Sequence, residues 1–156
     1  MKAIHWIIAA AALSFVQPAQ AATTDPEVII YRFPGVLDNG GSLDMGVATV
    51  FLCTNFSGAT ENIRFVTRNN SGALLTNQVF TINHLATLTA ATHPTTAYSD
   101  VLNLLSTGPV TQGTTAIAAT SINVICTAVT IDASTVAPVG VALRGIRFSP
   151  APGSQE

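Results

Sequence analysis

Charged residues are scarce in this chain, and two residue types are nearly missing from it. Charged side chains make up 9% of the 156 residues, and tryptophan occurs once, as Trp6. The one lysine is Lys2, so every basic residue after it is an arginine. A chain with so few cations lacks the basic patch that draws nucleic acids or anionic lipids to a protein surface. The sequence therefore predicts no nucleic-acid partner.

Cysteine is also rare, with 2 residues, Cys53 and Cys126. They form no CxxC motif and have no nearby histidine pair, so the sequence predicts no zinc site. In an oxidising compartment two cysteines are more often paired than free. We therefore predict a Cys53–Cys126 disulfide, with two buried free thiols as the alternative.

No apolar run in the chain is long enough to span a membrane. The longest, Ile4 to Val16, falls short of the roughly 20 residues that a membrane-spanning helix needs. It follows Lys2 and precedes Ala19-Gln20-Ala21, which fits the small-x-small cleavage rule of secretory signal peptides. We predict a cleaved signal peptide over residues 1–21 and a periplasmic or extracellular bacterial protein without a transmembrane segment. A membrane anchor is the alternative.

The remaining chain has the length of one domain, which we place at residues 22–149, followed by a flexible tail at 150–156. Strands are expected at Val47–Cys53 and Asn123–Ile131, which are apolar runs that each carry one cysteine. Both faces of Val47–Cys53 are apolar, which predicts a central strand. Residues Glu61–Arg68 alternate, with Ile63, Phe65 and Thr67 on the apolar side, which predicts a half-exposed strand.

Turn signals recur about every ten residues along this domain. Such spacing predicts an all-β fold, an antiparallel Ig-like β-sandwich of about seven to nine strands. No tryptophan lies between the two cysteines, so the expectation goes no further than Ig-like.

Four local expectations accompany this fold. A first strand, Val28–Phe33, should end at Pro34-Gly35. Residues Thr114–Ala119 and Val124–Ile131 should form a hairpin, and Val139–Phe148 should be one last strand. Residues Tyr98–Leu105 allow either a short helix or a strand.

Three segments resemble a group of short, uncharacterised exported bacterial proteins with two cysteines. The segments are Leu52-Cys53-Thr54-Asn55, then Thr115-Ala116-Ile117 leading to Ile125-Cys126-Thr127-Ala128, and Val141-Ala142-Leu143-Arg144. The resemblance implies a β-sandwich. It implies no activity, because its motifs are strands and turns.

The sequence shows no complete catalytic set. His84 and His93 are the histidines that follow the signal peptide, and no Gly-x-Ser-x-Gly motif is present. His84, Asp100 and a serine could assemble in space, but an ordinary structural role for His84 is favoured. We predict no catalytic residue, no metal site and no cofactor.

One loop offers oxygen ligands that suit calcium. Asp38, Asn39 and Asp44 lie in or beside a turn-rich segment, although their spacing does not match an EF-hand.

The favoured function is that of a non-enzymatic exported monomer that acts by surface contact with a protein or envelope partner. The first alternative is a module that binds a glycan or calcium through the Asp38–Asp44 loop. The second alternative is a pilin-like subunit that donates its Val28–Phe33 strand to a neighbour.

Overall fold

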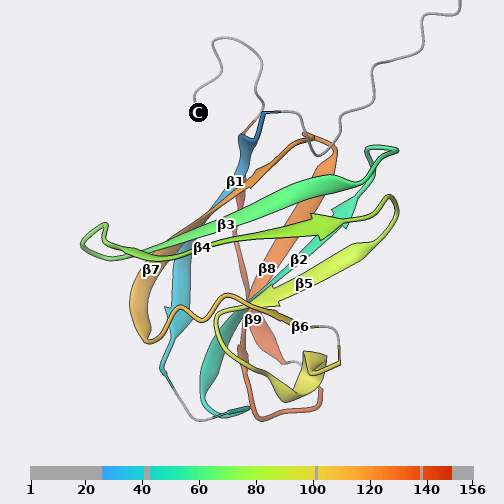
Figure 1. Ribbon diagram of the computed structural model, residues 1–156. Coiled ribbons are helices and arrows are strands. Elements are labelled where there is room, and N and C mark those ends of the chain that lie inside the picture. Colours follow the sequence, from blue (N-terminus) through green and yellow to red (C-terminus); the bar gives the residue numbers. More distant parts are fainter. Residues whose placement is uncertain (1–25, 41–42, 101, 138, 149–156) are drawn as a thin grey trace, which may run out of the picture.

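The computed structural model describes residues 26–40, 43–100, 102–137 and 139–148, and these residues form an all-β fold of two five-stranded sheets (Figure 1). The predicted signal peptide and tail lie outside the described residues. The first sheet has the order β10-β1-β7-β3-β4, with β1 Val28–Asp38, β3 Glu61–Asn69, β4 Leu74–Ile82, β7 Val110–Ala119 and β10 Ile146–Arg147. The second has the order β6-β5-β2-β8-β9, with β2 Val47–Asn55, β5 Thr87–Ala91, β6 Leu102–Leu104, β8 Val124–Asp132 and β9 Gly140–Leu143. Among the described residues, no helix is long and apolar enough to cross a membrane.

The core lies between the two sheets and is dominated by aromatic rings. Phe51 of β2 packs between Phe33 of β1 and Phe65 of β3, with ring centroids 5.6 and 5.7 Å apart. The predicted alternation of β3 is confirmed, because Ile63, Phe65 and Thr67 are buried while the intervening side chains are more exposed. In Figure 1, β3 and β4 accordingly lie in front of β2, β5 and β8.

Strand β2 is buried on both faces, as its continuous apolar run predicts. One face carries Phe51 and Cys53 into the main core. The other carries Val50 into a second, smaller cluster, against which Tyr98 and Leu102 pack. For Tyr98–Leu105 the sequence allowed either a helix or a strand. The structure has a short 3-10 helix, η1 (Thr96–Tyr98), followed by β6, and together they cover this outer face of β2.

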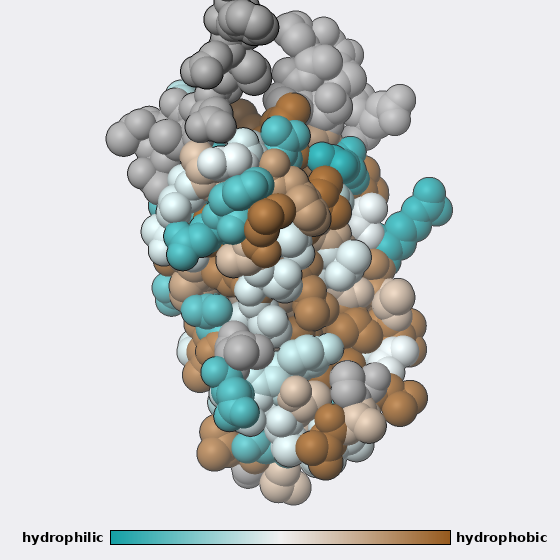
Figure 2. Space-filling view, turned by 90° about the vertical axis from the view of Figure 1, so that its right-hand side faces the viewer, coloured by the Kyte–Doolittle hydropathy of each residue, from teal (hydrophilic) through white to brown (hydrophobic). Residues whose placement is uncertain are grey.

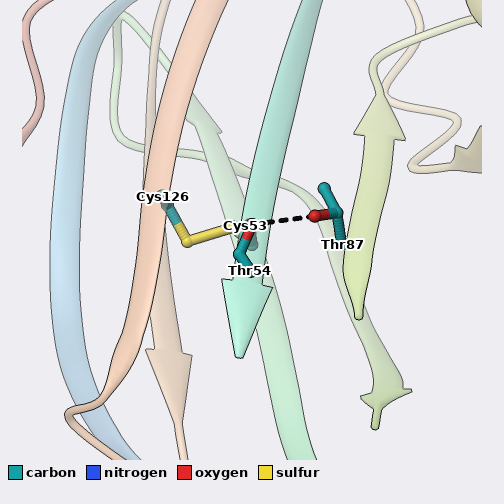
Figure 3. Close-up of a disulfide and its surroundings, with 4 residues drawn as sticks. All are labelled: Cys53, Thr54, Thr87 and Cys126. Atoms are coloured by element: carbon teal, nitrogen blue, oxygen red, sulfur yellow. Dashed lines mark hydrogen bonds between the residues drawn. A yellow bond between two sulfur atoms is a disulfide. The ribbon is translucent and has the colours of Figure 1, made fainter. Parts of the chain in front are cut away.

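The two cysteines are joined by a disulfide within the second sheet (Figure 3). Cys53 and Cys126 lie directly opposite each other in the β2–β8 register, with Cα atoms 4.1 Å apart. Both residues are buried. An immunoglobulin disulfide joins two different sheets, whereas this one joins neighbouring strands of the same sheet.

The predicted hairpin between Thr114–Ala119 and Val124–Ile131 is wrong. Strand β7 lies between β1 and β3 in one sheet, while β8 lies between β2 and β9 in the other. The connection leaves the first sheet late, because Thr120 still donates its N–H to Asn62 O of β3 at 3.1 Å. The short connection between Ala119 and Val124 therefore crosses from the first sheet to the second.

The predicted single last strand is also wrong, because it divides between the sheets. Strand β9 pairs with β8, and β10 pairs with β1. Gly145 lies at the crossing, where an added Cβ would come within 2.4 Å of the Phe33 ring. A residue with a side chain would not fit there, so the crossing closes this side of the domain tightly over the core.

The first strand is longer than predicted. It continues through Pro34 and Gly35 to Asp38, with register shifts against β7 on either side of Val36. Strand β10 pairs with only Tyr31 and Arg32, so Pro34 lies on an edge, where a missing N–H is tolerated. Gly35 takes φ +82°, which a residue with a side chain rarely adopts.

Replacing both cysteines with alanine should lower the free energy of unfolding by about 4 kcal/mol. The disulfide spans a sequence separation of 73 residues and restricts the unfolded chain accordingly. Denaturant titration of the oxidised protein and the variant measures the difference. Reduction of the wild-type protein is the control and should produce a similar loss, whereas alkylation of both sulfurs before reduction would contradict the disulfide.

Candidate functional site

Asp38, the first acid of the predicted ligand loop, is buried at the end of β1 and is held by contacts within the protein. The Gly40 N–H donates to Oδ1 at 2.7 Å, and His93 Nδ1 lies 2.9 Å from Oδ2. The Thr107 hydroxyl lies 3.5 Å from the same Oδ2 atom. Only 1% of Asp38 is exposed, so its carboxyl group faces the interior rather than a solvent-filled loop.

His93 uses both ring nitrogens in this cluster. Its Nε2 lies 3.0 Å from Met45 O, and a carbonyl oxygen can only accept, so Nε2 carries a proton. A second proton must lie between Nδ1 and Asp38 Oδ2 to complete that hydrogen bond. The pair therefore joins the end of β1, the segment before β2 and the loop after β5, and leaves no ring nitrogen available as a base.

The other two residues of the predicted loop do not join Asp38 around a common point in the contacts that the structure shows. Asn39 Oδ1 accepts the Val47 N–H at 3.0 Å. Asp44 is half-buried and has a left-handed backbone, with φ 56°. Within the described part of the chain, no group of three or more His, Cys, Asp or Glu residues is arranged to hold a metal ion. The geometry gives the calcium hypothesis no support.

The structure does not assemble the Ser/His/Asp set that the sequence allowed. His84 lies in the turn before β5, where Nδ1 accepts the Gly58 N–H at 3.0 Å. Asp100 is exposed beyond η1, which follows the far end of β5. His84 precedes β5 and His93 follows it, so the two histidines lie beyond opposite ends of this strand.

Glu61 is a buried acid that the sequence analysis missed. It is fully buried at the start of β3 and accepts a hydrogen bond at Oε2 from the Thr120 hydroxyl. The Asn62 N–H donates to that hydroxyl at 3.0 Å, so the Thr120 side chain adds two contacts to the backbone hydrogen bond that already joins the crossover to β3. The sequence did contain a sign of this burial, because Glu61 has the same strand parity as the inward-facing Ile63 and Phe65.

Two of the open hollows on the described surface have linings without histidine. One, of about 250 Å³, is lined by Gly35, Asn70 and Gln112 among others. The second, of about 210 Å³, is lined mainly by leucine and proline, together with Asp44 and Thr95. Their lining offers amides, hydroxyl groups and one carboxyl group, which is a poor set for nucleophilic or acid–base catalysis.

Two surface groups have clearly shifted pKa values. The pKa of Arg64 is raised, mainly because its guanidinium donates hydrogen bonds to Glu27, which ties the start of β1 to β3. The pKa of Asp132 is lowered, first by the Ser134 hydroxyl at 2.7 Å and then by the Ser134 N–H at 2.9 Å. Both arrangements stabilise surface segments, and neither places a charge in a hollow.

His93→Ala should lower the free energy of unfolding by about 3 kcal/mol, because the buried Asp38 carboxyl group would lose its ring partner. Asp38→Asn should cost much less. The asparagine oxygen can still accept the Gly40 N–H, and its amide can donate to a neutral His93 that keeps its bond to Met45. Denaturant titration of both variants checks this, and equal losses would contradict the assigned hydrogen bonds.

Ser134→Ala should raise the pKa of Asp132 toward its ordinary value, because the hydrogen bond from the Ser134 hydroxyl, the main cause of the lowered pKa, is lost. A lowered pKa means that the contribution of Asp132 to stability is present above its unfolded-state pKa and is lost as the pH falls through the folded-state value. NMR titration of the Asp132 carboxyl carbon measures the change. Ser99→Ala, on a different exposed segment, is the control and should leave the titration unchanged.

Comparison with known proteins gives no assignment. No protein-family model matches the chain, and neither a curated protein nor a solved structure matches it significantly. Function must therefore be inferred from the residues of the chain itself.

Proposed function

We propose that this protein is a non-enzymatic, exported Ig-like β-sandwich, periplasmic or extracellular, that acts by surface contact with a protein or envelope partner. Two sheets packed face to face support the sandwich, and a buried disulfide is compatible with export. The contacts of Asp38, His93 and Glu61 are internal, which favours a structural role for these groups over catalysis.

The observation that carries the proposal is an exposed apolar surface around β9. Val136, Val139 and Val141 leave 80%, 81% and 71% of their surface exposed. The three valines lie within six residues of the chain, and apolar side chains gathered in the open on one surface mark a site of contact. We call these three valines the β9 surface.

The character of one side of the molecule agrees with this role. In Figure 2, apolar residues reach the surface among pale, weakly polar ones, and strongly hydrophilic residues cover a smaller part of this side. A surface of this kind depends on shape and apolar contact for recognition, because it offers few charges for steering a partner.

Binding to envelope material tests the proposal. The purified, oxidised protein should sediment with the envelope fraction of the bacterium that exports it, and V139K/V141K should weaken this binding on the order of tenfold. Both valines are largely exposed, so the charges should not disturb folding. Leu85→Lys, at a 66% exposed leucine in the turn before β5, is the matched control.

Equal binding by the wild-type protein and V139K/V141K would refute the β9 surface. A broad hydrolase panel covers the enzymatic alternative. Robust turnover that disappears on replacing His84 or His93 would refute the non-enzymatic role.

A further inference from the structure

Strand β4 is a long edge strand with a free side. Among the described residues only β3 pairs with it, and it has 9 residues. The other terminal strands of the two sheets are shorter, since β10, β6 and β9 have 2, 3 and 4 residues. Beyond its pairing with β3, β4 therefore presents a long row of backbone donors and acceptors.

This edge lacks the devices by which natural proteins prevent edge pairing. Such devices include charged side chains, proline and very short edge strands. The sequence of β4, LLTNQVFTI, contains no charged residue, no proline and no glycine. By contrast, the first-sheet edge formed by β1 beyond β10 carries Pro34 and two register shifts. Two apolar side chains of β4, Leu74 and Val79, are exposed by 52% and 40%.

We propose that β4 is a self-association edge, at which a second copy of this chain adds its own β4 in antiparallel orientation. The two first sheets then become one continuous sheet with twofold symmetry. The proposal departs from the expected monomer, and it involves a different surface from the β9 surface.

The strand sequence is self-complementary in register. Gln78 is the middle residue of β4, so full overlap of two antiparallel copies places Gln78 opposite Gln78. In this register Thr76 lies opposite Phe80, and Leu74 lies opposite Ile82 of the second copy. Thr76, Gln78, Phe80 and Ile82 have the same strand parity, so these residues face the same side of the extended sheet in both copies. Leu74 lies beyond the register shift between β3 and β4, where it pairs with the exposed Arg68, and is not part of this match.

The charges around β4 favour a second copy in the antiparallel sense. Arg68 pairs with Leu74 and therefore lies at one end of the strand. Antiparallel pairing separates the two Arg68 residues by the length of the strand, about 27 Å, which exceeds the Debye length of about 10 Å. Parallel pairing would bring the two Arg68 residues to the same level, separated by both β4 strands or about 14 Å, so their repulsion is weaker in the antiparallel arrangement. Arg64 lies opposite Val79 nearer the middle, but Glu27 neutralises it.

Sedimentation velocity of the oxidised mature protein over a concentration series tests the proposal. The wild-type protein should show a reversible monomer–dimer equilibrium. Q78K and Q78E should each weaken the dimer on the order of tenfold, because like charges would face each other across the twofold axis. An equimolar mixture of Q78K and Q78E should restore dimers, since opposite charges then meet. Gln78 is exposed, so both variants should fold.

Leu85→Lys, which adds a charge outside β4, is the control and should leave the dimer unchanged. A wild-type protein that remains monomeric throughout, a dimer insensitive to residue 78, or a mixture that fails to restore dimers would each overturn the proposal. Envelope binding through the β9 surface is measured separately with V139K/V141K, so the two proposals fail independently.

Discussion

The fold depends on the burial of β2 on both of its faces. Phe51 and Cys53 point into the main core, while Val50 packs under the segment that contains η1 and β6. A strand buried in this way has one register in which all its apolar side chains are covered. The disulfide to Cys126 lies in that register, so the covalent bond and the apolar packing favour the same pairing of β2 with β8.

Polar side chains secure the places where the chain leaves a sheet. The Asp38–His93 pair joins the end of β1 to two loops, and the Glu61–Thr120 contact fixes the start of the crossover from β7 to β8. A buried polar group is costly unless it is hydrogen-bonded, so these contacts specify the chain path as well as contributing to stability. Asp38 and both histidines that the sequence singled out thus have partners within the protein.

The two sides of the domain differ in how they are closed. At one side the chain crosses from β9 to β10 through Gly145, which packs against Phe33. At the other side β4 ends its sheet with a long uncharged edge. A domain with low charge has few means of protecting such an edge, and this is the physical basis of the proposed self-association.

The sequence by itself determined the all-β class, the inward residues of β3 and the central position of β2, because these follow from local alternation and apolar runs. Tertiary structure alone decided which sheet each strand joins. The supposed hairpin of β7 and β8 and the supposed last strand both divide between sheets, because an apolar strand face is equally satisfied by either layer. It also decided that Asp38 meets His93 across 55 positions of sequence, since no local pattern specifies a contact over that distance.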